Sequence, residues 1–490
     1  MSKKVKAIII GGAVLLLLGG LLVFLLKTQK KPADETSSTA PKPAISVISE
    51  DEQTLESAIV SNKDGEYEIK LVGEKKWGIS ELADLAYVDY KYTNFATTLS
   101  TLNASQIVTE TADNLEEYGL AKPRATCKLK YKNGNTYEVI LGNKTTDTAN
   151  YYFMIKGETK VYVSDGYGIE VLTKNKYSYL DTLLYPSFDK QDSKTIPQIQ
   201  KLTVTRPDLA KPIIFENTNK DSSVEMLQKV LNMTSPVNIA INTTVTEPYI
   251  YSLFGMSATE IVSAKATAKE KQDYGLDKPA ATVEIKYDDT KVAKIIIGNG
   301  RDCQHEEGED LKDHTHTTAS YYVMKEASDI IYVVDKTKMV WLDMDAEKVM
   351  SSIVLMPNVL DLDAIAVNAN DKDYLFKLTH SKDDKDAAVL AVTCNGNTVS
   401  DTQFRTLLQI MYTTPVDKIN TSPATGGAVM SVTYKYNNGH ADDKLVLYPL
   451  TDRSYIYEVN GNRDLAGRAS YPEKVAKEIE NLIAGKPVTK

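Results

Sequence analysis

The sequence predicts an α+β protein, in which an amino-terminal transmembrane helix is followed by three related modules rich in antiparallel sheet. Three observations support this prediction. The chain of 490 residues has a long apolar stretch without charge near its amino terminus. Segments of the remaining chain recur at a fixed spacing, which is the signature of internal duplication. Tyr, a good strand former, outnumbers Phe and Trp with counts of 29, 8 and 2.

The first element is the apolar stretch over residues 7–26, which follows a short basic segment at residues 1–6. As a helix it would be about 30 Å long, which matches the hydrocarbon core of a bilayer. A cleavable signal peptide has a shorter apolar region that ends in small residues, so we expect a permanent anchor. We expect residues 1–6 in the cytoplasm and all modules outside it, with the cell membrane as the location and the lipid bilayer as a partner.

A spacer follows the anchor over residues 27–44. It is rich in Pro, Ser and Thr and has no apolar face, which is typical of an extended linker. We therefore expect the folded part of the chain to start near Ile45.

The modules are recognised by a repeated motif. Residues 118–123 read YGLAKP, and residues 274–279, which lie 156 positions later, read YGLDKP. The same spacing relates the Gly-Asn pair at 142–143 to that at 298–299. A register that holds over so many residues indicates duplication rather than chance.

The second copy contains an insertion. Tyr151-Tyr152 corresponds to Tyr321-Tyr322, so the spacing grows from 156 to 170 residues, which places 14 additional residues after Asn299. We accordingly predict repeat module 1 at residues 45–190 and repeat module 2 at residues 191–355 with an inserted loop at 300–317.

A third, degenerate module is predicted at residues 356–490. Its segment 434–439, YKYNNG, resembles residues 129–134, LKYKNG, but it lacks the Tyr-Gly-Leu motif. Its opening near Ala364–Val367 resembles two earlier segments, which we expect to be the opening strands of the other modules: Tyr67–Val72 and Ile199–Val204.

Local patterns give a coarse secondary structure. Cys127, Leu129 and Tyr131 alternate with lysines, which is the period of a strand with one exposed face. Asn133-Gly134 predicts a hairpin turn because both residues tolerate a positive φ. Two segments are expected to be helical: Tyr92–Leu102 and Val224–Leu231.

These motifs resemble the repeated domain of the family known as domain of unknown function 4340, or DUF4340. The resemblance rests on the Tyr-Gly-Leu-x-Lys-Pro segment, the Ala-Thr strand, the Gly-Asn step and the Tyr-Tyr strand, and it covers nearly all of the folded region. It implies a bacterial protein that is membrane-anchored or exported and is often encoded beside ABC-type transport systems. It supplies no catalytic residue.

Composition and motifs exclude several classes of activity. The formal net charge of −9 argues against nucleic-acid binding, which needs a basic surplus. The sequence lacks the nucleophile elbow, the zincin motif and the P-loop. We therefore expect no enzymatic activity, no catalytic residue and no cofactor.

The inserted loop holds the best candidate for metal chemistry. Cys303, His305, His314 and His316 lie within it, and a thiolate with imidazoles could complete a tetrahedral zinc site. Their spacing matches no standard zinc module, and the first copy lacks the loop. A solvated acidic loop is the preferred interpretation, and a metal site or a reactive thiol is the alternative.

The other distinctive residues have structural interpretations. Cys127 aligns with Val283 on a buried strand face, and Cys394 precedes a hairpin turn; a disulfide between the two cysteines is conceivable but unsupported. Trp77 and Trp341 could line a ligand groove, although packing is the preferred role. One ring of each Tyr pair should face outward, either for cross-strand packing or for contact with a partner.

The predicted function is that of a non-catalytic, membrane-anchored, extracytoplasmic binding or scaffold protein, accessory to an ABC-type transport system. Its partners would be permease subunits or envelope polymers. Two alternatives remain: an envelope-bound metalloprotein or hydrolase that uses the Cys/His-rich loop, and a cell-wall-binding or adhesin-like surface protein.

Overall fold

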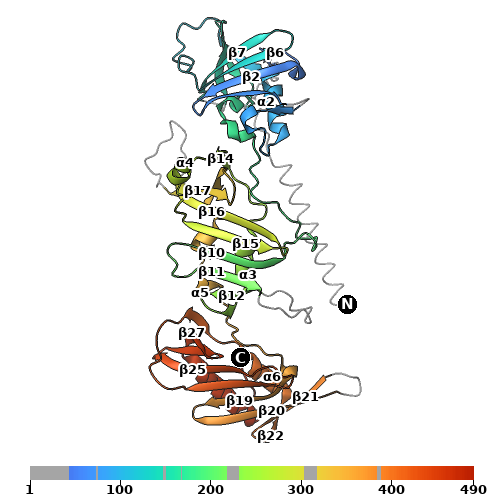
Figure 1. Ribbon diagram of the computed structural model, residues 1–490, viewed down its shortest axis with the longest axis vertical. Coiled ribbons are helices and arrows are strands. Elements are labelled where there is room, and N and C mark those ends of the chain that lie inside the picture. The colour runs from blue at the N-terminus through green and yellow to red at the C-terminus, as the bar shows by residue number, and fades with distance from the viewer. Residues whose placement is uncertain are drawn as a thin grey trace, which may run out of the picture. The chain divides into compact units, whose positions relative to one another are not determined.

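The computed structural model describes residues 44–72, 76–146, 150–166, 168–217, 231–302, 317–382 and 388–490. In these ranges the chain forms three antiparallel nine-stranded sheets with a few helices (Figure 1). The apolar stretch at residues 7–26 lies outside them, so the membrane helix stays a prediction. No helix within the described ranges is long and apolar enough to span a membrane.

Sheet 1 has the strand order β1-β5-β9-β8-β7-β6-β2-β3-β4. Its strands are β1 Ile45–Ser46, β2 Leu55–Asn62, β3 Gly65–Val72, β4 Lys76–Gly78, β5 Asn103–Thr109, β6 Ala125–Tyr131, β7 Thr136–Lys144, β8 Tyr151–Ile155 and β9 Val161–Ser164.

Sheet 2 has the order β13-β12-β11-β10-β15-β16-β17-β18-β14. Its strands are β10 Ile199–Thr205, β11 Ile213–Asn217, β12 Leu231–Ser235, β13 Ile239–Ala240, β14 Glu260–Ser263, β15 Ala281–Tyr287, β16 Lys291–Asp302, β17 Thr318–Lys325 and β18 Ile331–Asp335.

Sheet 3 has the order β22-β21-β20-β19-β24-β25-β26-β27-β23. Its strands are β19 Leu362–Ala369, β20 Lys372–Lys382, β21 Ala388–Cys394, β22 Asn397–Val399, β23 Val416–Ile419, β24 Met430–Tyr436, β25 Asp443–Thr451, β26 Ser454–Val459 and β27 Asn462–Arg468.

The three sheets share one plan of eight strands. Read from β5, β14 and β23 respectively, each sheet runs through the next four strands in reverse chain order and then through its opening strands. Sheet 1 adds β1 at one edge, whereas sheets 2 and 3 add β13 and β22 at the other. The third copy, which is degenerate in sequence, therefore keeps the complete plan. We call each sheet with the helices packed on it module 1, 2 or 3.

One helix stands at the same place in each module, between the opening strands and the first edge strand. These helices are α2 Asp89–Ser100, α3 Thr243–Tyr251 and α6 Asp401–Tyr412. The others are α4 Ala268–Asp273, α5 Ala346–Val349 and α7 Ser470–Ile483, with 3₁₀ turns at η1 Glu52–Thr54, η2 Ser80–Leu82, η3 Gly168–Thr173, η4 Lys176–Tyr179, η6 Lys336–Lys338, η7 Val340–Asp343 and η8 Val359–Asp361.

The helices mark the buried face of each sheet. On β6, Cys127, Leu129 and Tyr131 are buried and the intervening lysines are exposed, as the alternation predicted. The Tyr131 hydroxyl donates to Ser100 Oγ of α2 at 3.1 Å, which places α2 on that face. In module 3, Phe404 of α6 packs on Phe376 of β20, with ring centroids 5.3 Å apart.

The register confirms several details of the predicted repeat. Tyr152 pairs with Val163 and Tyr322 with Val333, so the Tyr pairs of the two copies are equivalent. The predicted turn at Asn133-Gly134 connects β6 to β7, and Gly134 has a φ of +91°. The third-copy segment 434–439 likewise includes the end of β24 and starts the connection to β25.

One prediction of local structure was wrong, and a second is contradicted at its last residue while the rest of it lies outside the described residues. Tyr67–Val72 belongs to β3, whereas the strand equivalent to β10 and β19 is β2, because β2 is the strand that pairs with β6. Adjacent strands of a hairpin share the same alternation, so periodicity could not separate them. Leu231 is the first residue of strand β12 rather than the end of a helix, and Val224 lies outside the described residues. The helix predicted at Tyr92–Leu102 is present as α2.

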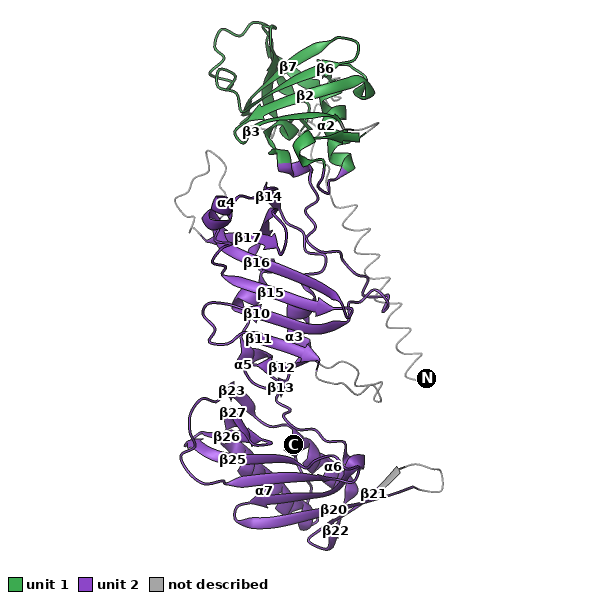
Figure 2. Ribbon diagram, viewed as in Figure 1, with its two compact units in different colours: residues 1–83, 89–176 green, residues 84–88, 177–490 purple. Residues whose placement is uncertain are grey.

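The chain separates into two compact units (Figure 2). Unit 1 is made of residues 1–83 and 89–176 and holds sheet 1. Unit 2 is made of residues 84–88 and 177–490 and holds sheets 2 and 3.

Candidate functional site

The Cys/His-rich loop lies outside the described residues, which end at Asp302 and resume at Thr317. The zinc hypothesis for Cys303, His305, His314 and His316 therefore stays a prediction. Zinc titration of the wild type and of the doubly substituted His314→Ala/His316→Ala chain tests it, because equal weak uptake by both would contradict a site. Elsewhere, the described part of the chain has no cluster of side chains that could hold a metal ion.

Cys127 and Cys394 are buried free thiols. Burial raises the pKa of Cys127 far above the ordinary value, and it raises the pKa of Cys394 to about 11. The thiolate is the reactive form of cysteine, so neither residue is poised for nucleophilic chemistry. The predicted structural role of Cys127 is confirmed, since its side chain and that of the equivalent Val283 in module 2 are both fully buried.

The Tyr-Gly-Leu motif builds a small second core on the outer face of sheets 1 and 2. In module 1, Leu120 packs with Met154 and Val161, and in module 2 Leu276 packs with Met324 and Ile331. The sequence motif therefore has a structural role in both modules.

Two close contacts explain why the motif and the Gly-Asn step each contain a glycine. Gly119 has a φ of +70°, and an added Cβ would lie 2.4 Å from the Asn143 side chain. A Cβ on Gly142 would lie 2.1 Å from the carbonyl oxygen of Tyr118, which accepts a 2.8 Å hydrogen bond from the Asn143 amide. Motif and Gly-Asn step are thus two halves of one contact, and they are repeated at Gly275 and Gly298.

The outward Tyr rings belong to the same core. The Tyr118 and Tyr152 ring centroids are 5.1 Å apart, and those of Tyr274 and Tyr322 are 4.3 Å apart. Of the two predicted roles, packing is the one that the structure shows for these rings.

Trp341 also packs rather than lining a groove. Its side chain is fully buried, and its indole N–H donates to the carbonyl oxygen of Tyr249 in α3 at 2.8 Å. Trp77 lies on the edge strand β4 and is half-buried.

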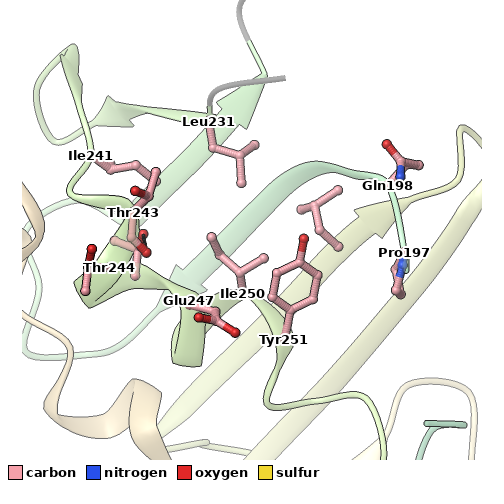
Figure 3. Close-up of a pocket in the computed structure, with 11 residues that line it drawn as sticks. Pro197, Gln198, Leu231, Ile241, Thr243, Thr244, Glu247, Ile250 and Tyr251 are labelled. Atoms are coloured by element: carbon pink, nitrogen blue, oxygen red, sulfur yellow. Dashed lines mark hydrogen bonds between the residues drawn. The ribbon is translucent and has the colours of Figure 1, made fainter. Parts of the chain in front are cut away.

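The candidate binding site is a cavity of about 640 Å³ in module 2, between α3 and sheet 2 (Figure 3). A volume of this order fits a small organic ligand. Its apolar wall is aliphatic, and its polar wall carries hydroxyl, amide and carboxylate groups. The lining residues are Pro197, Gln198, Ile199, Leu231, Ile241, Thr243, Thr244, Thr246, Glu247, Ile250 and Tyr251. Leu231 is the first described residue after the gap at 218–230.

Helix α3 positions the polar wall. Asn242 caps it by accepting from the Thr244 amide at 3.2 Å, so Thr243, Thr244 and Glu247 fall on its first two turns. Figure 3 shows Glu247, Ile250 and Tyr251 side by side on this helix.

Among the described lining residues, the carboxylate of Glu247 is paired with a lysine. Glu247 forms an ion pair with Lys190 at 3.0 Å, and both side chains are more than half exposed. Such a pair contributes less than about 1 kcal/mol to stability. Burial and then the Glu247 carboxylate raise the pKa of Tyr251, which therefore stays protonated at neutral pH. The Tyr251 ring is held by Phe188, with centroids 5.4 Å apart.

The sequence offered no signal for this cavity. Thr246, Glu247 and Tyr251 match no motif, and their shared position depends on the place of α3 in the fold.

Comparison with protein families gives two matches to one model. The model described as "Domain of unknown function (DUF4340)" matches residues 77–279 and 232–413. The matches start on the equivalent strands β4 and β12, and each continues past one sheet into the strands of the next. Neither a curated protein nor a solved structure matches the chain. Because the model matches more than half of the residues, the chain belongs to the DUF4340 family and contains this domain twice.

Proposed function

We propose that the chain is a non-catalytic binding or scaffold protein, anchored in the cell membrane by residues 7–26, whose modules lie outside the cytoplasm and serve an ABC-type transport system. The observation that carries the proposal is the threefold use of one eight-stranded plan. Three copies of one module enlarge the surface that can bind partners, whereas a catalytic site needs only one set of reactive groups.

The repeated residues support a binding role because their side chains serve packing. Leu120 and Leu276 are buried in equivalent small cores, and the glycines of the Gly-Asn steps allow the backbone to approach closely. What the copies share is thus a scaffold, and what differs among them is available for recognition.

The edges of the sheets favour recognition through faces and loops. The terminal strands β4, β13 and β22 have three, two and three residues. Short edge strands discourage the addition of a further strand from another chain. On the exposed face of sheet 2, Lys294 lies 2.5 Å from Glu326 and 3.6 Å from Glu284, which is a solvated surface of paired charges.

The link to a transport system is drawn from the family resemblance. Permease subunits are the proposed partners, and envelope polymers are the alternative ligand of the same surfaces.

Co-purification tests the proposal. Full-length tagged chain, gently solubilised from membranes, is expected to retain permease and ATPase subunits in fixed proportion. A matched control carries an unrelated transmembrane helix in place of residues 7–26 and should retain them as well if the modules make the contact. Background recovery in both preparations, together with retention on isolated cell wall, would contradict the transport role and favour the surface-polymer role.

A further inference from the structure

The connecting segments enter modules 2 and 3 at equivalent places. Leu183 bridges Ser257, three residues before β14 begins, and Ile353 bridges Thr413, three residues before β23 begins. The side chains that follow each bridge can therefore be compared. Of these two segments, the second alone leaves large apolar side chains exposed.

Module 2 buries the segment that enters it. Leu184 is 3% exposed. The Tyr185 hydroxyl donates to the carbonyl oxygen of Lys294 at 2.9 Å and accepts from the amide of the same residue at 2.8 Å. The Phe188 ring packs on Tyr251. The fold can thus cover an apolar segment at this entry.

The segment that enters module 3 stays exposed. Residues 353–360, which we call the apolar linker, read IVLMPNVL. Ile353, Met356 and Leu360 are 36%, 61% and 46% exposed, and they are three of the nine large apolar side chains exposed in the described ranges. Scattered apolar side chains are ordinary on a surface, whereas several close together mark a site that binds a partner.

Hydrogen bonds from module 3 fix the backbone of the apolar linker. The Tyr412 hydroxyl donates to the carbonyl oxygen of Pro357 at 2.8 Å, and the Asn437 side-chain amide donates to that of Leu360 at 3.1 Å. These contacts hold the linker through its carbonyl groups and leave the exposed side chains of Met356 and Leu360 for another molecule.

Carboxylates flank the apolar linker on both sides. Residues 343–363 carry five carboxylates against one lysine, a net charge of −4: Asp343, Asp345, Glu347, Asp361 and Asp363 against Lys348. The three carboxylates that precede the linker are accessible, since they line a cavity of about 960 Å³ formed by described residues of modules 2 and 3. The surface beside the linker is therefore acidic.

We propose that the apolar linker binds an apolar segment of another protein that carries lysines or arginines on both sides. Opposite charges at the two ends would steer and align this partner. A second copy of the chain would bring two acidic surfaces together, and an anionic lipid surface would repel them, so charge favours the basic protein segment over both. The inference rests on the binding role proposed above and specifies the chemistry of the partner.

A photoreactive peptide tests this inference on the full-length chain in nanodiscs of zwitterionic lipid. The probe has a core of leucines, one of them photoleucine, between two pairs of lysines, and the crosslinked residues are mapped by mass spectrometry. We expect saturable crosslinking to residues 353–360. The same peptide with glutamates in place of lysines should crosslink about tenfold less, because like charges repel.

Two double variants of matched exposure provide the decisive comparison. Met356→Ser/Leu360→Ser removes the apolar contact and should lower crosslinking about tenfold. Tyr90→Ser/Val292→Ser removes two side chains that are 62% and 49% exposed elsewhere on the chain, and it should leave crosslinking unchanged.

Three results would overturn the inference. They are equal crosslinking of the lysine and glutamate peptides, undiminished crosslinking of Met356→Ser/Leu360→Ser, and crosslinking of the apolar linker to a photoreactive lipid or to a second copy of the chain in place of the peptide. A chain that binds the lysine peptide through the linker but recovers no permease would contradict the transport role and support this inference.

Discussion

Replacing Gly142 by Ala tests how the repeated motif stabilises a module. The added Cβ would lie 2.1 Å from the carbonyl oxygen of Tyr118. No real Cβ approaches a backbone oxygen so closely, so the Tyr118-Gly119-Leu120 segment has to move away from β7. Gly142 does not have a positive φ, which means that the effect is steric and not one of backbone strain.

The structure sets the size of the effect. Movement of the segment breaks the 2.8 Å hydrogen bond from the Asn143 amide to Tyr118, a loss of about 1 kcal/mol. It also partly exposes Leu120, which is 4% exposed, at a further cost of about 2 kcal/mol. We therefore expect module 1 to lose about 3 kcal/mol of unfolding free energy, which corresponds to about a 100-fold larger unfolded fraction.

The buried thiols provide the assay. Cys127 lies in module 1 and Cys394 in module 3, and neither is accessible in the folded chain. The rate of maleimide labelling, resolved by peptide mass spectrometry, reports the unfolded fraction of each module when folding is faster than labelling. Gly142→Ala should accelerate labelling of Cys127 about 100-fold and leave Cys394 unchanged.

Two matched variants control this experiment. Gly298→Ala makes the same clash in module 2, 2.3 Å from the Tyr274 carbonyl, and should leave Cys127 unchanged because the compact unit of module 1 is separate. Gly427→Ala adds a methyl group that meets nothing within 4 Å and should change neither thiol. Labelling of Cys127 at the wild-type rate in Gly142→Ala would refute the reasoning.

Two further predictions concern backbone strain and acid sensitivity. Ala327 has a φ of +57° in the β17–β18 turn, so Ala327→Gly should stabilise that hairpin by up to about 1 kcal/mol, seen as slower amide exchange. Gly157 in module 1 has a φ of +93° and free space around it, so Gly157→Ala should destabilise module 1 by about 1 kcal/mol and accelerate Cys127 labelling about fivefold; equal exchange and labelling rates would contradict the role of φ. Burial of Glu478 acts to raise the pKa of its carboxyl, but hydrogen bonds from Asn481 and Thr489 outweigh it and hold the pKa below 4.5. The ionised carboxylate therefore stabilises the fold above pH 4.5, and this stabilisation is lost as the pH falls through the lowered pKa. Glu478→Gln should therefore lessen the drop in module 3 melting temperature between pH 7 and pH 3, whereas Glu473→Gln, at an exposed position, should not.

The sequence predicted the elements whose signal is local and repeated. Side-chain alternation and identical residues in two copies were enough to predict three features: the buried positions of Cys127 and Val283, the turn at Gly134, and the equivalence of the Tyr pairs. The segment Tyr67–Val72 was wrongly predicted to be the opening strand because β2 and β3 have the same alternation of side chains. Only the pairing of β2 with β6 distinguishes the two strands.

The cavity could not be predicted from the sequence for a different reason. Its lining residues match no motif, and they meet at one cavity only because α3 packs on sheet 2. The third module resembles the first more closely in structure than in sequence. Tyr448 and Pro449 replace Gly142 and Asn143 at the equivalent positions, yet the strand order is the same.

The central claim, that an anchored chain presents its modules outside the cytoplasm, is tested most directly by labelling intact cells with a membrane-impermeant maleimide. The experiment uses a Cys303→Ser chain, in which the buried Cys127 and Cys394 should not react with the maleimide. One accessible cysteine is then added to each of two variants, by Ser2→Cys or by Asp452→Cys, and Asp452 lies in an exposed hairpin. We predict that Asp452→Cys is labelled in intact cells and that Ser2→Cys is labelled only after lysis. Labelling of Ser2→Cys alone in intact cells, or of neither before lysis, would contradict the claim.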